Sequence, residues 1–81
     1  MHMPRKPGTP PTVTGRVLAI LDALGGAGDP AGLSLAEISR RADLPLSTTF
    51  RLVQELLAGR ILARDDQRRY RIGPRLRELA G

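Results

Sequence analysis

Residues 33–59 read LSLAEISRRADLPLSTTFRLVQELLAG, and this stretch predicts the fold. Ser34 and Glu37 have the spacing of a capping box, in which each side chain accepts a hydrogen bond from the other residue's backbone N–H, and such a pair starts a helix. Pro45 disfavours helical geometry in the residue before it and therefore ends that helix. A second helix is predicted from about 46 to 58, and it stops at Gly59, a residue suited to a left-handed C-cap. Two short helices across a turn of three or four residues describe a helix-turn-helix.

The second helix has one apolar and one polar side when residues are placed at about 100° per step. The apolar side gathers Thr49, Leu52, Val53 and Leu56, with Leu46 and Leu57 at one margin. The opposite side carries Ser47, Arg51 and Gln54, flanked by Thr48 and Phe50. Arginine pairs with the acceptor edge of guanine, and glutamine pairs with adenine, so this side has the chemistry of a DNA-reading surface. A polar outer side is equally typical of an ordinary solvated helix.

The chain has 81 residues, enough for one small domain, and it contains no cysteine. Such a domain buries a modest fraction of its surface, so its stability margin is thin without disulfides, a metal or a partner. A lone His2 cannot make a zinc site, and no cofactor is predicted. Neither a long apolar run nor a signal-peptide core is present, which predicts a soluble cytoplasmic protein without a membrane segment. Without cysteine or clustered carboxylates no nucleophile or acid–base pair is available, so the sequence does not predict an enzyme.

The formal net charge of +5 is distributed unevenly along the chain. Residues 1–59 hold six bases and five acids, whereas residues 60–77 hold seven arginines against Asp65 and Asp66. Basic residues concentrated in one segment are expected of a phosphate-binding surface.

After Gly59 the apolar period changes from helical to alternating. Strands are predicted at 61–64 and 69–72, with Ile61, Ala63, Tyr70 and Ile72 as their apolar residues, around a polar tip at 65–68. On a winged-helix domain this hairpin is the wing, and Arg68 and Arg69 would reach an adjacent groove or its phosphates. The alternative is a solvated hairpin whose arginines only keep the protein soluble. The density of arginine in this segment favours the phosphate-binding interpretation.

The remaining segments complete the predicted organisation. Residues 1–12 are rich in proline and predict a disordered arm, which we interpret as an idle tail rather than an arm entering a minor groove. A first helix is predicted at about 14–24, with Val17, Ile20, Leu21 and Leu24 on one face, followed by a glycine-rich loop at 25–32. Leu33 is a minimal strand. A last helix starts at Pro74 and is too short to be stable alone, so the chain is interpreted as part of a longer protein.

The order of these elements resembles the N-terminal winged helix-turn-helix domain of IclR-type transcriptional regulators. The most specific matches are the Leu-Pro-x-Ser-Thr-x-x-Arg-Leu run at 44–52 and the Tyr-Arg-Ile-Gly-Pro run at 70–74. The resemblance implies a mostly α fold with a small β-hairpin, with a DNA-binding domain at 13–73 and the start of a linker helix at 74–81. It also implies a homodimer that binds double-stranded promoter DNA and senses a small-molecule effector through a C-terminal domain outside this sequence.

The same resemblance assigns DNA-binding residues. Ser47, Thr48, Phe50 and Arg51 fall where the family's recognition helix meets bases and phosphates, and Arg16 and Ser34 fall where contacts to the DNA backbone are common. Gln54, Arg68 and Arg69 complete the predicted set, with no catalytic or metal-binding residue. Leu46 departs from the family, which often has a basic or polar residue there, and its side chain would contact a thymine methyl or simply pack. The alternative class is a winged-helix protein-interaction module without DNA specificity, because the fold alone permits it.

Overall fold

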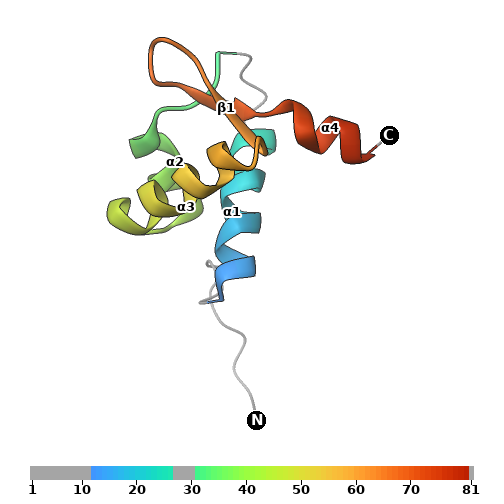
Figure 1. Cartoon of the computed structure of the whole chain (residues 1–81). Helices are drawn as coiled ribbons and strands as arrows, with labels where there is room; N and C mark the ends of the chain where they lie inside the picture. The colour runs from blue at the N-terminus through green and yellow to red at the C-terminus, as the bar shows by residue number, and fades with distance from the viewer. Residues whose placement is uncertain (1–11, 27–30, 81) are drawn as a thin grey trace.

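The computed structural model describes residues 12–26 and 31–80 of the chain. Its elements follow in the order α1 (Val13–Gly26), α2 (Leu35–Ala42), α3 (Leu46–Ala58), β1 (Leu62–Arg64), β2 (Tyr70–Ile72) and α4 (Pro74–Ala80). The two strands pair in antiparallel register, with Leu62 opposite Ile72 and Arg64 opposite Tyr70. The predicted winged helix-turn-helix, mostly α with a small β-hairpin, is confirmed (Figure 1). Most of the predicted N-terminal arm and half of the glycine-rich loop lie outside the described residues.

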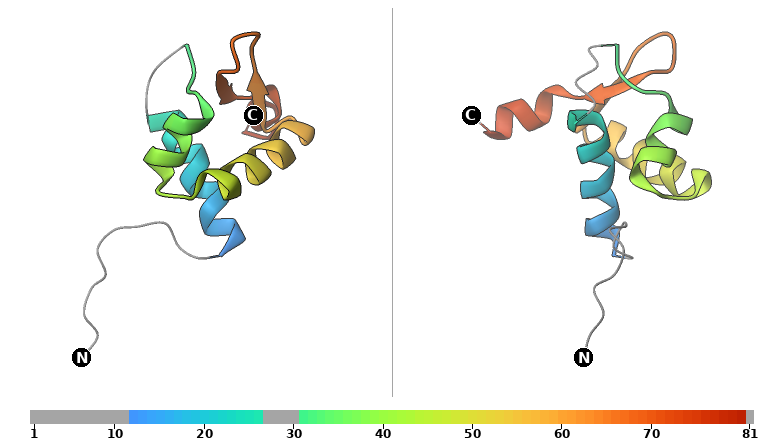
Figure 2. Two further views of the ribbon diagram at one scale, coloured as in Figure 1. Left: turned by 90° about the vertical axis from the view of Figure 1, so that its left-hand side faces the viewer. Right: turned by 180° about the vertical axis from the view of Figure 1, so that it is seen from behind.

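Three helices pack around one core, and the hairpin closes one end of it. α1 contacts α2, α2 contacts α3, β1 contacts α3 and β2 contacts α1. Each of the three helices contributes a fully buried side chain to the centre, namely Ile20, Ile38 and Val53. Leu62 and Tyr70 from the hairpin join the same cluster. α4 projects from this body on the side away from α2 and α3 (Figures 1 and 2), so the hairpin and the helix-turn-helix are left open to solvent.

The apolar face of α1 is the predicted one. Ile20 and Leu24 are buried, and Val17 and Leu21 pack against the same cluster. The helix continues to Gly26, two residues beyond its predicted end. Amphipathic spacing therefore fixes which side of α1 meets the core, although it does not fix the last turn.

Both ends of α2 are closed by local hydrogen bonds. At the start, the Ser34 hydroxyl accepts from the Glu37 N–H at 3.2 Å, and the Glu37 carboxylate accepts from the Ser34 N–H at 2.8 Å. At the end, Asp43 adopts the left-handed conformation with φ 56°. The Asp43 N–H then donates to the Arg40 carbonyl, and the Leu44 N–H donates to the Ser39 carbonyl at 3.0 Å. This pair of bonds is the Schellman motif, which turns the chain directly into Pro45 and α3.

Replacing Ser34 with alanine is expected to lower the free energy of unfolding by about 1 kcal/mol, since the Glu37 N–H loses its acceptor. Ser34→Thr keeps an acceptor oxygen and should stay within a few tenths of a kcal/mol of the wild type, an order-of-magnitude expectation for Ser and Thr caps. Urea unfolding followed by circular dichroism measures both values. An equal loss in the two variants would show that the cap is not the stabilising feature.

The end of α3 differs from the prediction. Gly59 has φ −85° and is not left-handed; the left-handed residue is the next one, Arg60, at φ 62°. The Arg60 N–H donates to the Leu57 carbonyl and the Ile61 N–H to the Leu56 carbonyl at 2.9 Å, which is again the Schellman pattern, one residue later. Tertiary bonds hold this later turn, because the Gly73 N–H donates to the Ile61 carbonyl at 2.7 Å.

This shift also moves the first strand. β1 begins at Leu62 rather than at residue 61, since the Ile61 N–H completes the end of α3. Leu62 is the buried residue of β1, whereas the prediction gave that role to Ile61 and Ala63. β2 begins at Tyr70, one residue later than predicted. The existence and pairing of the strands are thus confirmed. The alternation of β1 is displaced by one residue, whereas Tyr70 and Ile72 face the core in β2 as predicted.

Candidate nucleic-acid interface

The inward side of α3 fixes which of its residues face solvent. Thr49, Leu52 and Val53 are buried as predicted, and the Thr49 hydroxyl donates to the Pro45 carbonyl at 2.9 Å. A buried threonine hydroxyl needs such a partner, so this bond satisfies the one polar group on the inward side. The residues on the opposite side are exposed, namely Ser47, Arg51 and Gln54, with Phe50 exposed and Thr48 half-buried beside them. The predicted division of this helix into two sides is confirmed.

The tip of the hairpin is organised by Asp65. Its carboxylate accepts from the Gln67 N–H at 2.8 Å and from the Arg69 N–H at 3.0 Å. Arg68 lies between these residues in the left-handed conformation, with φ 60°. That conformation costs a non-glycine residue about 1–2 kcal/mol, and the bonds on either side of Arg68 hold it. The result is a defined turn that presents the Arg68 side chain to solvent.

A second set of bonds attaches the hairpin to the start of α2. Leu33, the predicted minimal strand, pairs with Tyr70 through N–H to carbonyl distances of 2.9 and 2.7 Å. The Arg69 guanidinium donates to the Gly32 carbonyl at 3.2 Å and lies 3.7 Å from the Glu37 carboxylate. The hairpin is therefore held in a fixed position beside the helix-turn-helix.

The five arginines between residues 60 and 71 divide into two groups. Three of them form ion pairs within the protein, Arg60 with Glu78, Arg69 with Glu37, and Arg71 with Asp65. Arg64 and Arg68 are exposed and form no ion pair within the described part of the chain. The charge available to a partner at the hairpin thus comes from Arg64 and Arg68.

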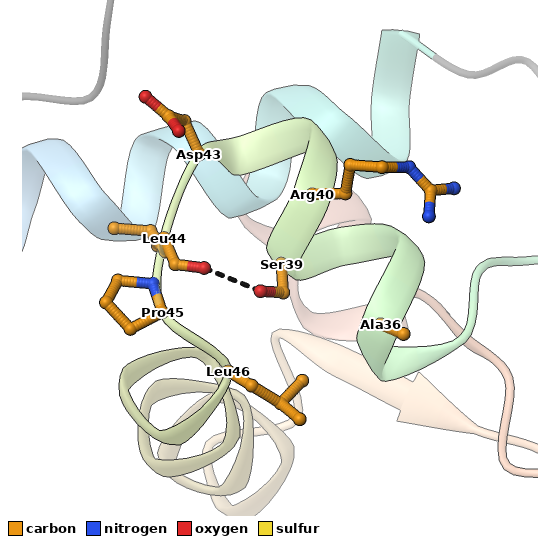
Figure 3. A pocket seen from close by; sticks show the side chains of 7 residues that line it. All are labelled: Ala36, Ser39, Arg40, Asp43, Leu44, Pro45 and Leu46. Atoms are coloured by element: carbon orange, nitrogen blue, oxygen red, sulfur yellow. Dashed lines mark hydrogen bonds between the residues drawn. The ribbon is translucent and has the colours of Figure 1, made fainter.

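A groove of about 520 Å³ lies between α3, the start of α2 and the hairpin. It is lined by Ser34, Leu35, Ala36, Leu46, Phe50, Arg64, Gln67, Arg68 and Tyr70. These lining residues include two arginines and no acid, so the groove is basic, and five of the others are apolar or aromatic: Leu35, Ala36, Leu46, Phe50 and Tyr70. A second hollow of about 640 Å³ adjoins it at the turn between α2 and α3, where Leu46 lies opposite Ala36 and Ser39 (Figure 3). We call the groove together with the exposed side of α3 the helix–hairpin face.

Most of the predicted site residues lie on the helix–hairpin face, and two of them do not face a partner there. Ser34, Phe50 and Arg68 line the groove, and Ser47, Arg51 and Gln54 are exposed along the adjoining side of α3. Arg69 is occupied by the bonds to Gly32 and Glu37. Arg16 lies half-buried on α1, outside the groove lining. Arg64 and Gln67 also line the groove and were not predicted as site residues. Arg64 ends β1 and Gln67 lies in the turn, so their position beside α3 depends on how the hairpin packs.

Two carboxylates of this region are held in their charged form. The Ser34 backbone N–H, followed by the Ser34 hydroxyl and the nearby Arg69 and Arg41, lowers the pKa of Glu37. Backbone hydrogen bonds from Arg69 and then Gln67, with help from the Arg71 guanidinium, lower the pKa of Asp65. A lowered pKa in the folded state means that the charged carboxylate stabilises the fold above the pKa of the unfolded chain.

Acid is therefore expected to destabilise the domain through these two groups. Their contribution to the stability of the fold is complete above the ordinary carboxyl pKa values, 4.5 for Glu37 and 3.8 for Asp65. It is lost as the pH falls through the lower pKa values that the two groups have in the folded protein. The thermal midpoint should fall below about pH 4.5, and Glu37→Gln and Asp65→Asn should each make that fall shallower. Thermal scans between pH 7 and pH 2.5 measure how steeply the thermal midpoint falls with pH. An unchanged fall in both variants would exclude these carboxylates as its cause.

In the ranges 12–26 and 31–80, no helix has the length and apolar character required to cross a membrane. The same ranges contain no cluster of three or more His, Cys, Asp or Glu side chains that could hold a metal ion.

Comparison with known proteins identifies the domain. The profile of the IclR helix-turn-helix domain matches residues 13–66, which is more than half of the chain. The chain belongs to the IclR family. The matched range runs from the first residue of α1 to the tip of the hairpin, so it contains the helix-turn-helix and most of the helix–hairpin face. No curated protein matches the chain.

Solved structures agree with this assignment. An IclR homologue from Microbacterium hydrocarbonoxydans, complexed with 4-hydroxybenzoate, is 38% identical with a TM-score of 0.72, over 79% of this chain and 26% of its own length. The repressor BlcR of Agrobacterium tumefaciens is 37% identical with a TM-score of 0.68, over 80% of this chain and 25% of its own. The O-methyltransferase NcsB1 of neocarzinostatin biosynthesis is 26% identical with a TM-score of 0.61, over 82% of this chain and 20% of its own.

The chain thus spans about a quarter of the length of these two IclR-type relatives. The family is one of transcriptional regulators and not of enzymes, and the part of it that this chain contains is the DNA-binding helix-turn-helix domain.

Proposed function

We propose that this IclR domain binds double-stranded DNA in a sequence-specific manner, with α3 in the major groove and the hairpin on the flanking backbone. One observation carries the proposal. The exposed hydrogen-bonding side of α3 adjoins a groove whose other wall presents Arg64 and Arg68, two arginines without an ion pair in the described chain. Side chains for base edges beside cations for phosphates are the combination that duplex recognition requires.

The proposal assigns different roles to the residues of this face. Arg51 and Gln54 would read base edges, with Ser47 and Thr48 contacting bases or phosphates near the start of α3. Pro45, at the N-cap position of α3, provides no side-chain hydrogen bond, so the first N–H groups of the helix remain available to a phosphate. Arg68 and Arg64 would contact phosphates, as would Arg16 from α1.

Ser34 and Arg69 are assigned a positioning role in place of a direct contact with DNA. Both residues already make bonds inside the protein, Ser34 to Glu37 and Arg69 to Gly32. We therefore expect them to contribute mainly by holding α2 and the hairpin in the geometry that the duplex meets.

We further propose that the longer protein acts as a homodimer on a two-fold operator. Val13 and Leu18 on α1 and Leu79 on α4 are large apolar side chains with 54–68% exposure, and they lie on the elements that do not line the groove. Exposed apolar side chains of this kind are suited to contact with a second copy. Sedimentation at several concentrations tests this step, and a strictly monomeric chain up to millimolar concentration would contradict dimerisation through these residues.

An effector would act from outside this domain. The Microbacterium relative was solved with 4-hydroxybenzoate, and this chain corresponds to 26% of that protein. We propose that a small molecule controls DNA binding through a further domain of the full-length regulator, which would work in the cytoplasm with bacterial promoters.

Selection of bound sites from a library of random duplexes tests the proposed function. We expect enrichment of a consensus with two-fold symmetry, because two copies of α3 read two half-sites. Failure to enrich any sequence, with binding to all duplexes alike, would contradict sequence-specific recognition.

The same selection distinguishes the second candidate, a protein-interaction module. That candidate is supported by the O-methyltransferase, which carries this fold in an enzyme. An interaction module would enrich no sequence, since any binding through its exposed arginines would be to phosphates and equal for all duplexes.

A further inference from the structure

The recognition side of α3 carries two large apolar side chains that the core does not explain. Leu46 is 54% exposed and Phe50 is 50% exposed. Within the described chain, neither belongs to the core cluster nor packs against it. Sequence analysis left open whether Leu46 packs, and this exposure excludes packing into the core as its role.

The two side chains lie together on one wall of the groove. They are four residues apart on a helix, so they are neighbours on its surface, and both line the groove that faces the hairpin. Leu35 and Tyr70 provide further apolar surface on the groove, and Arg64 and Arg68 provide its positive charge. An apolar pair with arginines around it is suited to an apolar group carried by a polyanion.

Duplex DNA offers one such group in the major groove. Each base pair presents hydrogen-bond donors and acceptors there, and the C5-methyl of a pyrimidine is the apolar exception, present on thymine and absent from unmodified cytosine. The polar stripe of Ser47, Arg51 and Gln54 runs beside the apolar pair on the same helix. Hydrogen bonds would thus be read along one stripe and methyl groups along the other.

We infer that Leu46 and Phe50 are specificity-determining residues that select thymine by contact with its C5-methyl group. This inference rests on the proposed function, because it requires α3 to enter the major groove. Part of the sequence preference would then come from apolar contacts. The free energy of these contacts does not depend on salt, unlike that of the phosphate contacts of Arg64 and Arg68.

The test removes the methyl group from the DNA and leaves the protein unchanged. The probe is the duplex obtained by site selection, remade with deoxyuridine at one thymine position of each half-site at a time. Burial of one methyl group is worth about 0.8 kcal/mol, so the wild-type chain should bind about fourfold more weakly for each contacted thymine that is replaced. The binding constant is measured by fluorescence anisotropy at fixed salt.

Protein variants then assign the effect to the apolar pair. For Leu46→Ala and Phe50→Ala, the dissociation constants of the thymine and deoxyuridine duplexes should be nearly equal at the position that each side chain contacts. Thr14→Ala is the control, since Thr14 is exposed on α1 and does not line the groove; it should keep the full fourfold ratio, about the value of one methyl group. Amide spectra of the variants confirm that each is folded.

Three results would overturn the inference. One is equal affinity of the wild-type chain for thymine and deoxyuridine at every position. Another is a thymine preference that persists in both Leu46→Ala and Phe50→Ala. The third is tighter binding only after cytosines are replaced by 5-methylcytosine, which would assign the methyl group to a modified base instead of thymine. Each of these outcomes leaves the proposed function intact, whereas a selection that enriches no duplex removes the function and the inference together.

Discussion

Replacing Arg51 with alanine is expected to reduce discrimination between the preferred site and a site with one changed base pair by roughly 1–3 kcal/mol, the value of a good bidentate contact. Arg51 is exposed on the outward side of α3, opposite the buried Leu52 and Val53. Its side chain is therefore free to reach a base edge without cost to the core. Affinity for unrelated duplexes should change much less, because their contacts are mainly to phosphates.

Arg68→Gly is the matched variant for a phosphate contact. Glycine adopts the left-handed φ of 60° found at Arg68 without steric cost, so the hairpin should keep its shape. All duplexes should then bind more weakly by a similar factor, and the slope of log affinity against log salt should fall by about one phosphate contact. Anisotropy titrations at several salt concentrations on preferred and unrelated duplexes separate the two behaviours. Identical effects of the two variants would contradict the division of roles.

Replacing Ile38 with alanine is expected to destabilise the domain by about 2–5 kcal/mol, through the lost transfer energy and the cavity that remains. Ile38 is 0% exposed and lies in the cluster that also contains Ile20 and Val53. A small domain has a free energy of unfolding of only about 5–15 kcal/mol, so this single change removes a large part of it. Substantial unfolding at 37 °C should follow, with loss of DNA binding as a consequence.

Leu18→Ala provides the control for that measurement. Leu18 is also a large apolar residue, but it is 54% exposed, so its truncation should change the free energy of unfolding by less than about 0.5 kcal/mol. Urea unfolding at 25 °C gives both values, and the denaturant slope should be unchanged if the transition stays two-state. A loss at Ile38 no larger than that at Leu18 would mean that α2 does not pack as the structure describes.

Local features explain why much of the fold could be predicted from the sequence. The capping box of Ser34 and Glu37 acts within four residues, and the inward residues of α3 follow from helical spacing alone. Leu33 could be predicted as a minimal strand because it is an apolar residue directly before the capped helix, whereas its pairing with Tyr70 joins distant segments. Orientation of Ser47, Arg51 and Gln54 toward solvent follows from the same helical spacing.

Features that depend on distant contacts could not be predicted in this way. The turn after α3 falls at Arg60 instead of Gly59 because Gly73 and Arg75, far along the chain, donate to the carbonyls of Ile61 and Arg60. Likewise, sequence alone treats the arginines of segment 60–77 as equivalent, although Arg69 and Arg71 are paired inside the protein and Arg64 and Arg68 are not. The groove itself arises where three elements meet, so no single motif encodes it.

Titration of the isotopically labelled chain with the selected duplex, followed by amide chemical shifts, shows whether the helix–hairpin face binds DNA. We expect the largest shifts at Ser47, Arg51, Gln54 and Arg68, which lie on that face. Small shifts are expected on α4, which projects away from that face (Figure 2). Largest shifts on α4, or a spectrum unchanged by duplex in dilute buffer, would show that the helix–hairpin face is not the DNA-binding surface.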